Sequence, residues 1–218
     1  MNTWGQFESV CSELGWCFSE FQLAQFKKYY EFLVAYNKTV NLTAITNLED
    51  VLHKHFIDSL MVAKYINLLE SKVVDVGTGA GFPGIPLKIL TPSLNLTLLD
   101  SLKKRVKFLN ELLIVLNINC EILHAAAQEQ SKKKDKGCFN LVVSRAAMNV
   151  EKLIWASAAF LKIGGQLVAL KGYEVEQELE IATSQMQKSK LEICSVNKFL
   201  LPNGDRRSIV VFKKAAIE

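Results

Sequence analysis

A short apolar run that contains one acid and then breaks into glycines has the clearest chemical meaning in the chain. The run is Val73–Val76, the acid is Asp75, and four of the residues 77–84 are glycine. Each glycine costs roughly 0.5–1 kcal/mol relative to alanine inside a helix or strand, so this density predicts a sharp strand-to-helix turn. Such a turn lays bare backbone against a ligand, and the helix N-terminus that follows favours a nucleotide-like group. We therefore expect a nucleotide-like ligand at this turn.

Two cofactor motifs overlap in the turn. Gly79, Gly81 and Gly84 have the spacing of a dinucleotide-binding fingerprint. Gly77, Gly79 and Gly81, preceded by an acid, resemble the first motif of S-adenosylmethionine-dependent methyltransferases. Asp100 ends the next predicted strand, where a carboxylate can accept both hydroxyls of an adenosine ribose. Both kinds of cofactor use that acid, so Asp100 does not separate them.

The rest of the chain predicts strands that alternate with helices. Strands are expected at 71–76, 95–99, 119–123, 139–143, 166–170, 191–200 and 208–212. Helices are expected over 3–37 as a pair, 48–66, from 85 onward, 102–116, 150–161 and 173–188. Alternation of this kind requires a mostly parallel sheet with helices on both faces. No helix separates the last two strands, so they predict an antiparallel hairpin at one edge.

We expect an α/β fold of the class I methyltransferase (Rossmann-like) type. It has a seven-stranded, mostly parallel sheet, a C-terminal antiparallel hairpin and an N-terminal helical extension. Residues 1–70 are expected to form the extension, packed on the core, and residues 71–218 the S-adenosylmethionine-binding domain. The edge hairpin favours a methyltransferase over a dehydrogenase. Ligands in such sheets lie beyond the carboxyl ends of the strands.

Charge and cysteine usage narrow the class of protein further. The net charge is +4, and the basic residues gather in clusters that either contact phosphates or keep the surface soluble. These clusters are Lys103, Lys104, Arg105 and Lys107; Lys132, Lys133, Lys134 and Lys136; and Arg206, Arg207, Lys213 and Lys214. The five cysteines are scattered without a C-x-x-C pair, so we expect reduced thiols and no metal site. No apolar run approaches the roughly 20 residues that span a bilayer, and no signal peptide is evident, so we expect a cytoplasmic protein.

Several longer motifs resemble the bacterial glucose-inhibited division protein B family. They are Asp75–Leu87, Leu98–Ser101 with Lys104–Leu109, Val143–Ala146, Tyr36–Lys38 through Asn41–Thr43, and His55–Ser59. The Gly-Phe-Pro-Gly-Ile-Pro string and the His-x-x-Asp-Ser helix are specific to that family, whereas the G-x-G-x-G core is generic. The match covers roughly residues 20–213. Members of this family are small-subunit ribosomal RNA guanine-N7 methyltransferases.

The resemblance implies S-adenosylmethionine as cofactor and the 16S ribosomal RNA of the 30S particle as partner, with the enzyme acting as a monomer. It implies cofactor contacts at Gly77, Gly79, Gly81, Phe82, Asp100, Ala127 and Gln128. Arg145 is implied as the catalytic residue and a further cofactor contact, placed between the cofactor and the guanine. Asn41, His55, Lys171 and Arg206 match polar positions that face RNA or shape the pocket.

The chain departs from the family's pattern after the third predicted strand. The family usually has His-x-Arg-Ala-Glu, and here the stretch from His124 carries Ala126 in place of the arginine and Gln128 in place of the acid. Either Arg145 and Lys171 suffice, or Glu129 substitutes, or activity is reduced. The residues leave other functions open: a methyltransferase for another RNA or a small molecule, an NAD-dependent oxidoreductase, or a non-catalytic ribosome-binding protein.

Overall fold

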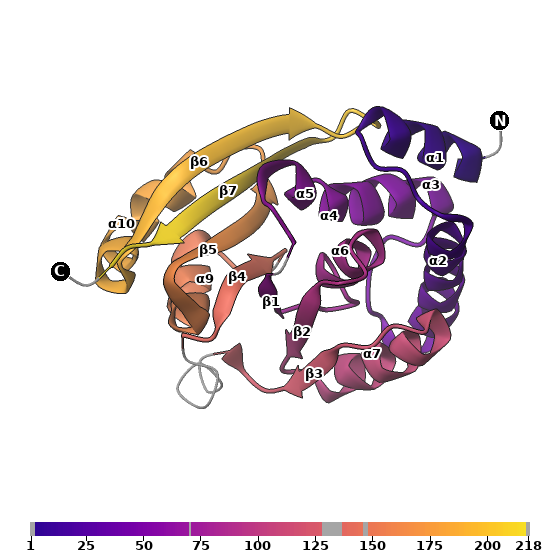
Figure 1. Cartoon of the computed structure of the whole chain (residues 1–218), viewed down its shortest axis with the longest axis horizontal. Helices are drawn as coiled ribbons and strands as arrows, with labels where there is room; N and C mark the ends of the chain where they lie inside the picture. Colours follow the sequence, from indigo (N-terminus) through magenta and orange to yellow (C-terminus); the bar gives the residue numbers. More distant parts are fainter. Residues whose placement is uncertain (1–2, 70, 128–136, 146–147, 217–218) are drawn as a thin grey trace.

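The computed structural model describes residues 3–69, 71–127, 137–145 and 148–216. Over these residues the chain forms a seven-stranded sheet with the order β3-β2-β1-β4-β5-β7-β6 (Figure 1). The strands are β1 Lys72–Val76, β2 Asn95–Asp100, β3 Glu121–His124, β4 Phe139–Ser144, β5 Leu161–Gly172, β6 Leu191–Leu200 and β7 Arg206–Lys214. Strands β1 to β5 pair in parallel, and β7 runs antiparallel to both β5 and β6. The predicted fold class and the C-terminal hairpin are confirmed.

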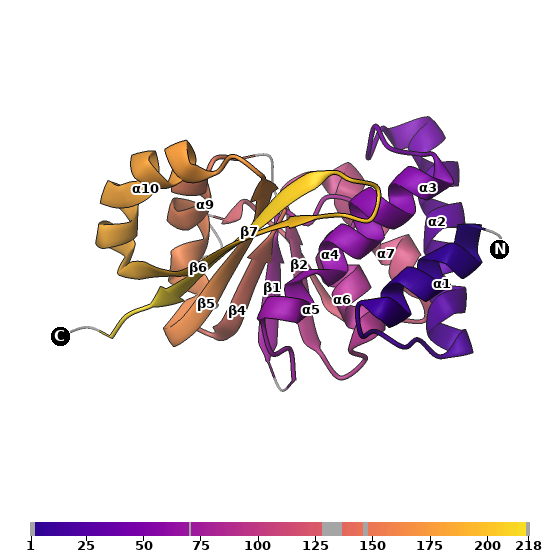
Figure 2. The same ribbon diagram turned by 90° about the horizontal axis from the view of Figure 1, so that it is seen from above.

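Helices cover both faces of the sheet (Figure 2). They are α1 Thr3–Glu13, α2 Glu20–Val40, α3 Leu48–Val51, η1 Leu52–Ile57, α4 Asp58–Leu60, α5 Val62–Tyr65, α6 Gly84–Leu90, α7 Lys103–Leu116, α9 Val150–Ser157, η2 Ala158–Phe160 and α10 Glu176–Ser189. The helices α9 and α10 lie against one face, and α2, α4, α6 and α7 against the other.

The strands divide their side chains between two hydrophobic cores. Successive residues of a strand point to opposite faces, so neighbours in sequence enter different cores. Val73 and Leu98 pack with the helices α1 to α7, whereas Val74 and Leu99 pack with α9 and α10. A sheet buried on both faces requires near-continuous apolar strands, and this explains why β1, β2 and β4 lack an alternating polar pattern.

The N-terminal helices share a core with the sheet. Ser19 and Gln22 form a capping box at the start of α2, as the sequence predicts. The buried face of α2 places Phe26 and Tyr29 against Phe56, and Phe7 of α1 packs on the same cluster. We propose that residues 1–70 act as an extension of the 71–218 domain, because their buried side chains are part of its core.

The helix predicted over 48–66 is present as consecutive helical segments from Leu48 to Tyr65, but it contains a π-helical turn that the sequence did not predict. Over Leu52–Ile57 the backbone widens, and the amide of Asp58 donates to the carbonyl of His53, five residues earlier. The guanidinium of Arg145 donates to the carbonyls of Lys54 and His55, at 2.9 and 3.3 Å. A widened turn is sustained when an outside group satisfies its carbonyls, and π-turns are frequent at functional sites.

The carboxylate of Asp75 fastens the glycine turn at both ends. Its Oδ2 accepts hydrogen bonds from Thr78 Oγ1 at 2.6 Å and from the Gly84 amide at 2.8 Å. The helix α6 consequently starts directly on the sheet. A Cβ at Gly84 would lie 2.8 Å from Asp75 Oδ2 and 2.9 Å from Leu98 Cδ2.

We predict that Gly84→Ala destabilises the protein by about 1–3 kcal/mol, because the added methyl group overpacks the junction of α6 and the sheet. Urea unfolding followed by far-UV circular dichroism should give a lower midpoint than wild type. Gly172→Ala is the matched control, since a Cβ there meets no described atom within 4 Å. Equal midpoints for both variants would contradict the tight contact at Gly84.

Candidate active site

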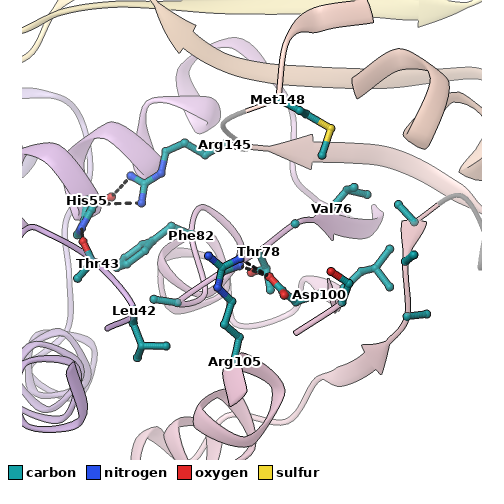
Figure 3. A pocket seen from close by; sticks show the side chains of 18 residues that line it. Leu42, Thr43, His55, Val76, Thr78, Phe82, Asp100, Arg105, Arg145 and Met148 are labelled. Carbon is teal, nitrogen blue, oxygen red and sulfur yellow. Dashed lines mark hydrogen bonds and ion pairs between the residues drawn. The ribbon is translucent and has the colours of Figure 1, made fainter. Parts of the chain in front are cut away.

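A cavity of about 500 Å³ lies at the carboxyl ends of β1, β2 and β4 (Figure 3). The glycine turn, the end of β2 and the alanines 125–127 form part of its lining. His55, Phe82 and Arg145 line another part. This is the edge of the sheet where the sequence predicts the ligand.

The three glycines of the motif have different roles in the turn. Gly77 and Gly79 line the cavity and adopt φ angles of +70° and +62°, which favour glycine. A Cβ at Gly79 would meet nothing among the described atoms closer than the Gly77 carbonyl at 4.0 Å, so its backbone is open to a ligand. Gly81 does not line the cavity. A Cβ there would lie 2.6 Å from both Tyr29 Oη and Ile85 Cδ1, so Gly81 makes room for helix packing.

Asp100 is buried and oriented at the cavity wall. Its Oδ2 accepts from the Gly79 amide at 2.9 Å and from Arg105 at 3.3 Å, and its Oδ1 accepts from the Leu102 amide at 2.9 Å. A carboxylate offers about four acceptor positions, so a further hydroxyl can still bind. Ala127 lines the same cavity, and Gln128 lies outside the described residues.

Arg145 connects the end of β4 to the π-turn. Besides the two helix carbonyls, its Nη1 lies 3.2 Å from Asp58 Oδ2 and its Nη2 lies 3.1 Å from His55 Nδ1. The guanidinium also stacks over Phe82, 4.6 Å from the ring centre. Figure 3 shows Arg145 and His55 pointing toward each other above Phe82. The side chain is therefore held in one orientation by several fixed partners.

His55 is a neutral positioning group. Burial, followed by the charge of Arg145, lowers the pKa of His55 from 6.5 to about 3. His55 Nδ1 lies 3.1 Å from Arg145 Nη2 and 3.2 Å from the Lys54 carbonyl, and Nε2 lies 3.0 Å from Thr43 Oγ1. The ring also stacks on Phe82, with centroids 4.5 Å apart. These contacts fix the orientation of His55, and its lowered pKa removes it as a proton carrier near neutral pH.

A second cavity of about 370 Å³ adjoins the first and shares His55 and Arg145 with it. Lys171 lines this second cavity, with its Nζ 2.7 Å from Glu178 Oε2 and donating to the Met148 carbonyl at 3.0 Å. The two cavities therefore meet at His55 and at Arg145, the residue that the family resemblance implies between cofactor and base.

Two of the predicted polar residues lie away from both cavities. Arg206 is exposed and stacks on Tyr173 at 3.8 Å, whereas Arg207 lines the second cavity beside Asp58. Strand alternation along β7 could have separated the two arginines. Asn41 is exposed and ends α2 in a left-handed conformation, with φ +49°.

Asn37 was missed by sequence reasoning, although it fixes the segment that closes the first cavity. Its Oδ1 accepts from the amides of Leu42 and Thr43, at 2.6 and 2.9 Å, and its Nδ2 donates to the Thr43 carbonyl. Leu42 and Thr43 both line the cavity. An asparagine followed by a polar segment is a signal for such local capping.

Neither a candidate metal site nor a membrane-spanning helix is present among the described residues. No group of three or more His, Cys, Asp or Glu side chains in the described part of the chain could hold a metal ion. None of the helices over the same residues is long and apolar enough to cross a membrane.

Known structures place the fold in one class of protein. A methyltransferase from Pyrococcus furiosus superposes with a TM-score of 0.60 at 12% identity, over 88% of this chain and 99% of that one. TYW2 from M. jannaschii, solved in complex with AdoMet, superposes with a TM-score of 0.58 at 16% identity, over 74% of this chain and 76% of that one. The chain has the class I methyltransferase fold.

Sequence comparison identifies the family within that class. Residues 22–210 match the GidB family, described as rRNA small subunit methyltransferase G. The ribosomal RNA small subunit methyltransferase G of Leuconostoc citreum is 40% identical over 213 residues, which cover 95% of this chain and 89% of that protein. Its namesake from Thermoanaerobacter sp. (strain X514) is 43% identical over 198 residues, 89% of this chain and 82% of that protein. The chain belongs to the GidB family, which confirms the resemblance carried by its motifs.

We predict that Asp75→Asn removes a pH dependence of stability. Burial raises the pKa of Asp75 from 3.8 to about 7, against the opposing effect of the Thr78 and Gly84 hydrogen bonds. Between these values the folded chain holds a proton that the unfolded chain releases. The wild-type free energy of unfolding therefore falls as pH rises through this window, by up to about 4 kcal/mol from this group.

The measurement is urea unfolding of wild type and Asp75→Asn at several pH values from about 4 to about 8. Asparagine has no carboxyl proton to lose, so the stability of the variant relative to wild type should rise across that range. Parallel stability curves for the two proteins would show that Asp75 does not hold its proton in the folded state.

Proposed function

We propose that the protein transfers a methyl group from S-adenosylmethionine to N7 of a guanine in 16S ribosomal RNA, acting on the small ribosomal subunit. The observation that carries this proposal is the meeting of two cavities at Arg145 and His55. One is built on a glycine turn and the other is lined mostly by polar and charged side chains. Membership of the GidB family supports the same substrate class.

The first cavity fits S-adenosylmethionine. Gly77 and the open backbone of Gly79 accommodate its methionine portion, and Asp100 is positioned to accept its ribose hydroxyls. Ala125–Ala127 present small side chains that leave space for the adenine. Phe82 forms the floor beneath Arg145. When bound, S-adenosylmethionine supplies an already activated methyl group.

The chain's own residues contribute to the reaction chiefly by holding the reacting groups in position. N7 of guanine carries a free lone pair, so no general base has to remove a proton, and His55 has no second proton to give at neutral pH. Arg145 is held by Lys54, Asp58 and His55, which fixes its side chain at the place where the base cavity meets the cofactor cavity. Rigid placement of the reacting atoms about 3–3.5 Å apart is the main source of rate in such a transfer.

Basic side chains around the second cavity suit an RNA partner. Lys54 and Arg207 line it, and Arg206 is exposed on β7 outside the cavity. Phosphate contacts of this kind make binding fall steeply with salt. We further propose that the 30S particle is the substrate and that the protein acts as a monomer in the cytoplasm.

The test is methyl transfer from tritiated S-adenosylmethionine to 30S particles from cells that lack this gene. The expected product is N7-methylguanosine at one position of 16S ribosomal RNA, mapped by cleavage at the modified base. Particles from cells that carry the gene should accept no further methyl groups. Tight cofactor binding without methyl incorporation into either particles or free RNA would refute the proposal.

We predict that Arg145→Lys lowers kcat/KM for the RNA by roughly 100-fold, because small displacements of a positioning group are costly. Lysine keeps a positive charge beside Asp58, yet its single ammonium cannot hold the helix carbonyls and His55 together. Cofactor affinity, measured by calorimetry, should change much less and serves as the internal control. Near-normal turnover by this variant would remove the role assigned to Arg145.

A further inference from the structure

The second cavity contains a neighbouring donor and acceptor that no step proposed so far uses. They are the ammonium of Lys171 on β5 and the carboxylate of Glu178 on α10, 2.7 Å apart. Both side chains line the cavity. Arg145 and His55 line this cavity too and are shared with the cofactor cavity, so a base bound in the second cavity can lie between the pair and the methyl donor.

Among the described residues, Glu178 is held through one of its two carboxylate oxygens. Its Oε2 accepts from Lys171 Nζ and also from the amide of Val150 at 2.9 Å. These two bonds orient the carboxylate and leave Oε1 available as an acceptor. The side chain of Glu178 remains 34% exposed, so a ligand in the cavity can reach it.

The other carboxylate of this cavity is already committed to cations. Asp58 Oδ2 lies 3.2 Å from Arg145 and Asp58 Oδ1 lies 3.8 Å from Arg207, and only 6% of the side chain is exposed. Of the two acids, Glu178 is therefore the one that can bind a polar edge of a substrate.

Resting on the function proposed above, we propose that Lys171 and Glu178 recognise the Watson–Crick edge of the target guanine. That edge presents an acceptor, O6, next to two donors, the N1–H and the N2 amine. Lys171 can donate its third N–H to O6, while Glu178 accepts from N1–H and the amine. Adenine presents a donor where O6 would lie and an acceptor at N1, so the same pair repels it. Enzymes that act on an extruded base commonly read this edge.

This orientation also explains which atom is left for reaction. N7 belongs to a different edge of the purine, which the pair does not cover. A guanine held by its Watson–Crick edge at Lys171 and Glu178 can therefore turn N7 toward Arg145 and the cofactor cavity. The recognition of guanine and the choice of N7 follow from the same contact.

The experiment compares guanosine with inosine, which lacks only the N2 amine, at the target position of 16S ribosomal RNA reconstituted into 30S particles. Wild type should prefer guanosine by about 10–100-fold in kcat/KM, the range expected for a hydrogen bond to a charged acceptor. Glu178→Gln should methylate the guanosine substrate less well and lose the preference. The variant side chain has one oxygen, which must face Lys171. Its NH₂ group then points toward the base and cannot accept from the N2 amine. Competition between the two substrates gives the ratio independently of how much of the variant is folded.

Glu180→Gln is the matched control, because Glu180 is exposed on the same helix and lines neither cavity. It should keep both the rate and the preference of wild type. A purely structural role for Glu178 would lower both rates equally and leave the preference intact, which would overturn this inference. A wild-type enzyme that methylates guanosine and inosine equally would also overturn it while the proposed function stands. Failure of wild type to methylate guanosine would overturn both.

Discussion

The architecture of the site depends on one buried carboxylate. Asp75 has no exposed surface, and it receives the Thr78 hydroxyl and the Gly84 amide on a single oxygen. Those two donors stand at the beginning and the end of the glycine turn. By binding both, Asp75 sets how far the turn departs from the sheet before α6 begins. The positions of Gly77 and Gly79 in the cavity wall, and of Phe82 beneath Arg145, follow from that constraint.

A second cross-link ties the N-terminal helices to the catalytic edge of the sheet. Tyr29 of α2 donates to the Ala80 carbonyl and stacks on Phe82, with ring centroids 5.2 Å apart. Arg145, which follows β4, donates hydrogen bonds to two carbonyls of the π-turn. The helices that precede β1 are thus part of the active site, since they supply both the support of the glycine turn and the wall that carries His55.

The sequence predicts the fold well because strand and helix periodicity are local signals. All seven strands and their hairpin could be located from apolar runs, turns and glycines. The π-turn could not, since its stabilising donor, Arg145, is about 90 residues distant in the chain. Arg206 was named through the family resemblance, whereas strand register decides that its neighbour Arg207 lines the second cavity. Gly81 was assigned to the ligand, and only the packing of Tyr29 reveals another reason for a glycine there.

The division of the site into two compartments has a consequence for inhibitors. Cofactor-like molecules fit the first cavity alone. Other class I methyltransferases share the fold in which that cavity lies. A compound that joins an adenosine group to a purine must pass Arg145 and His55, where the two cavities meet. Their polar groups already have partners within the protein, so a short uncharged linker suits this junction better than a cationic one. Selectivity would then come from the second compartment.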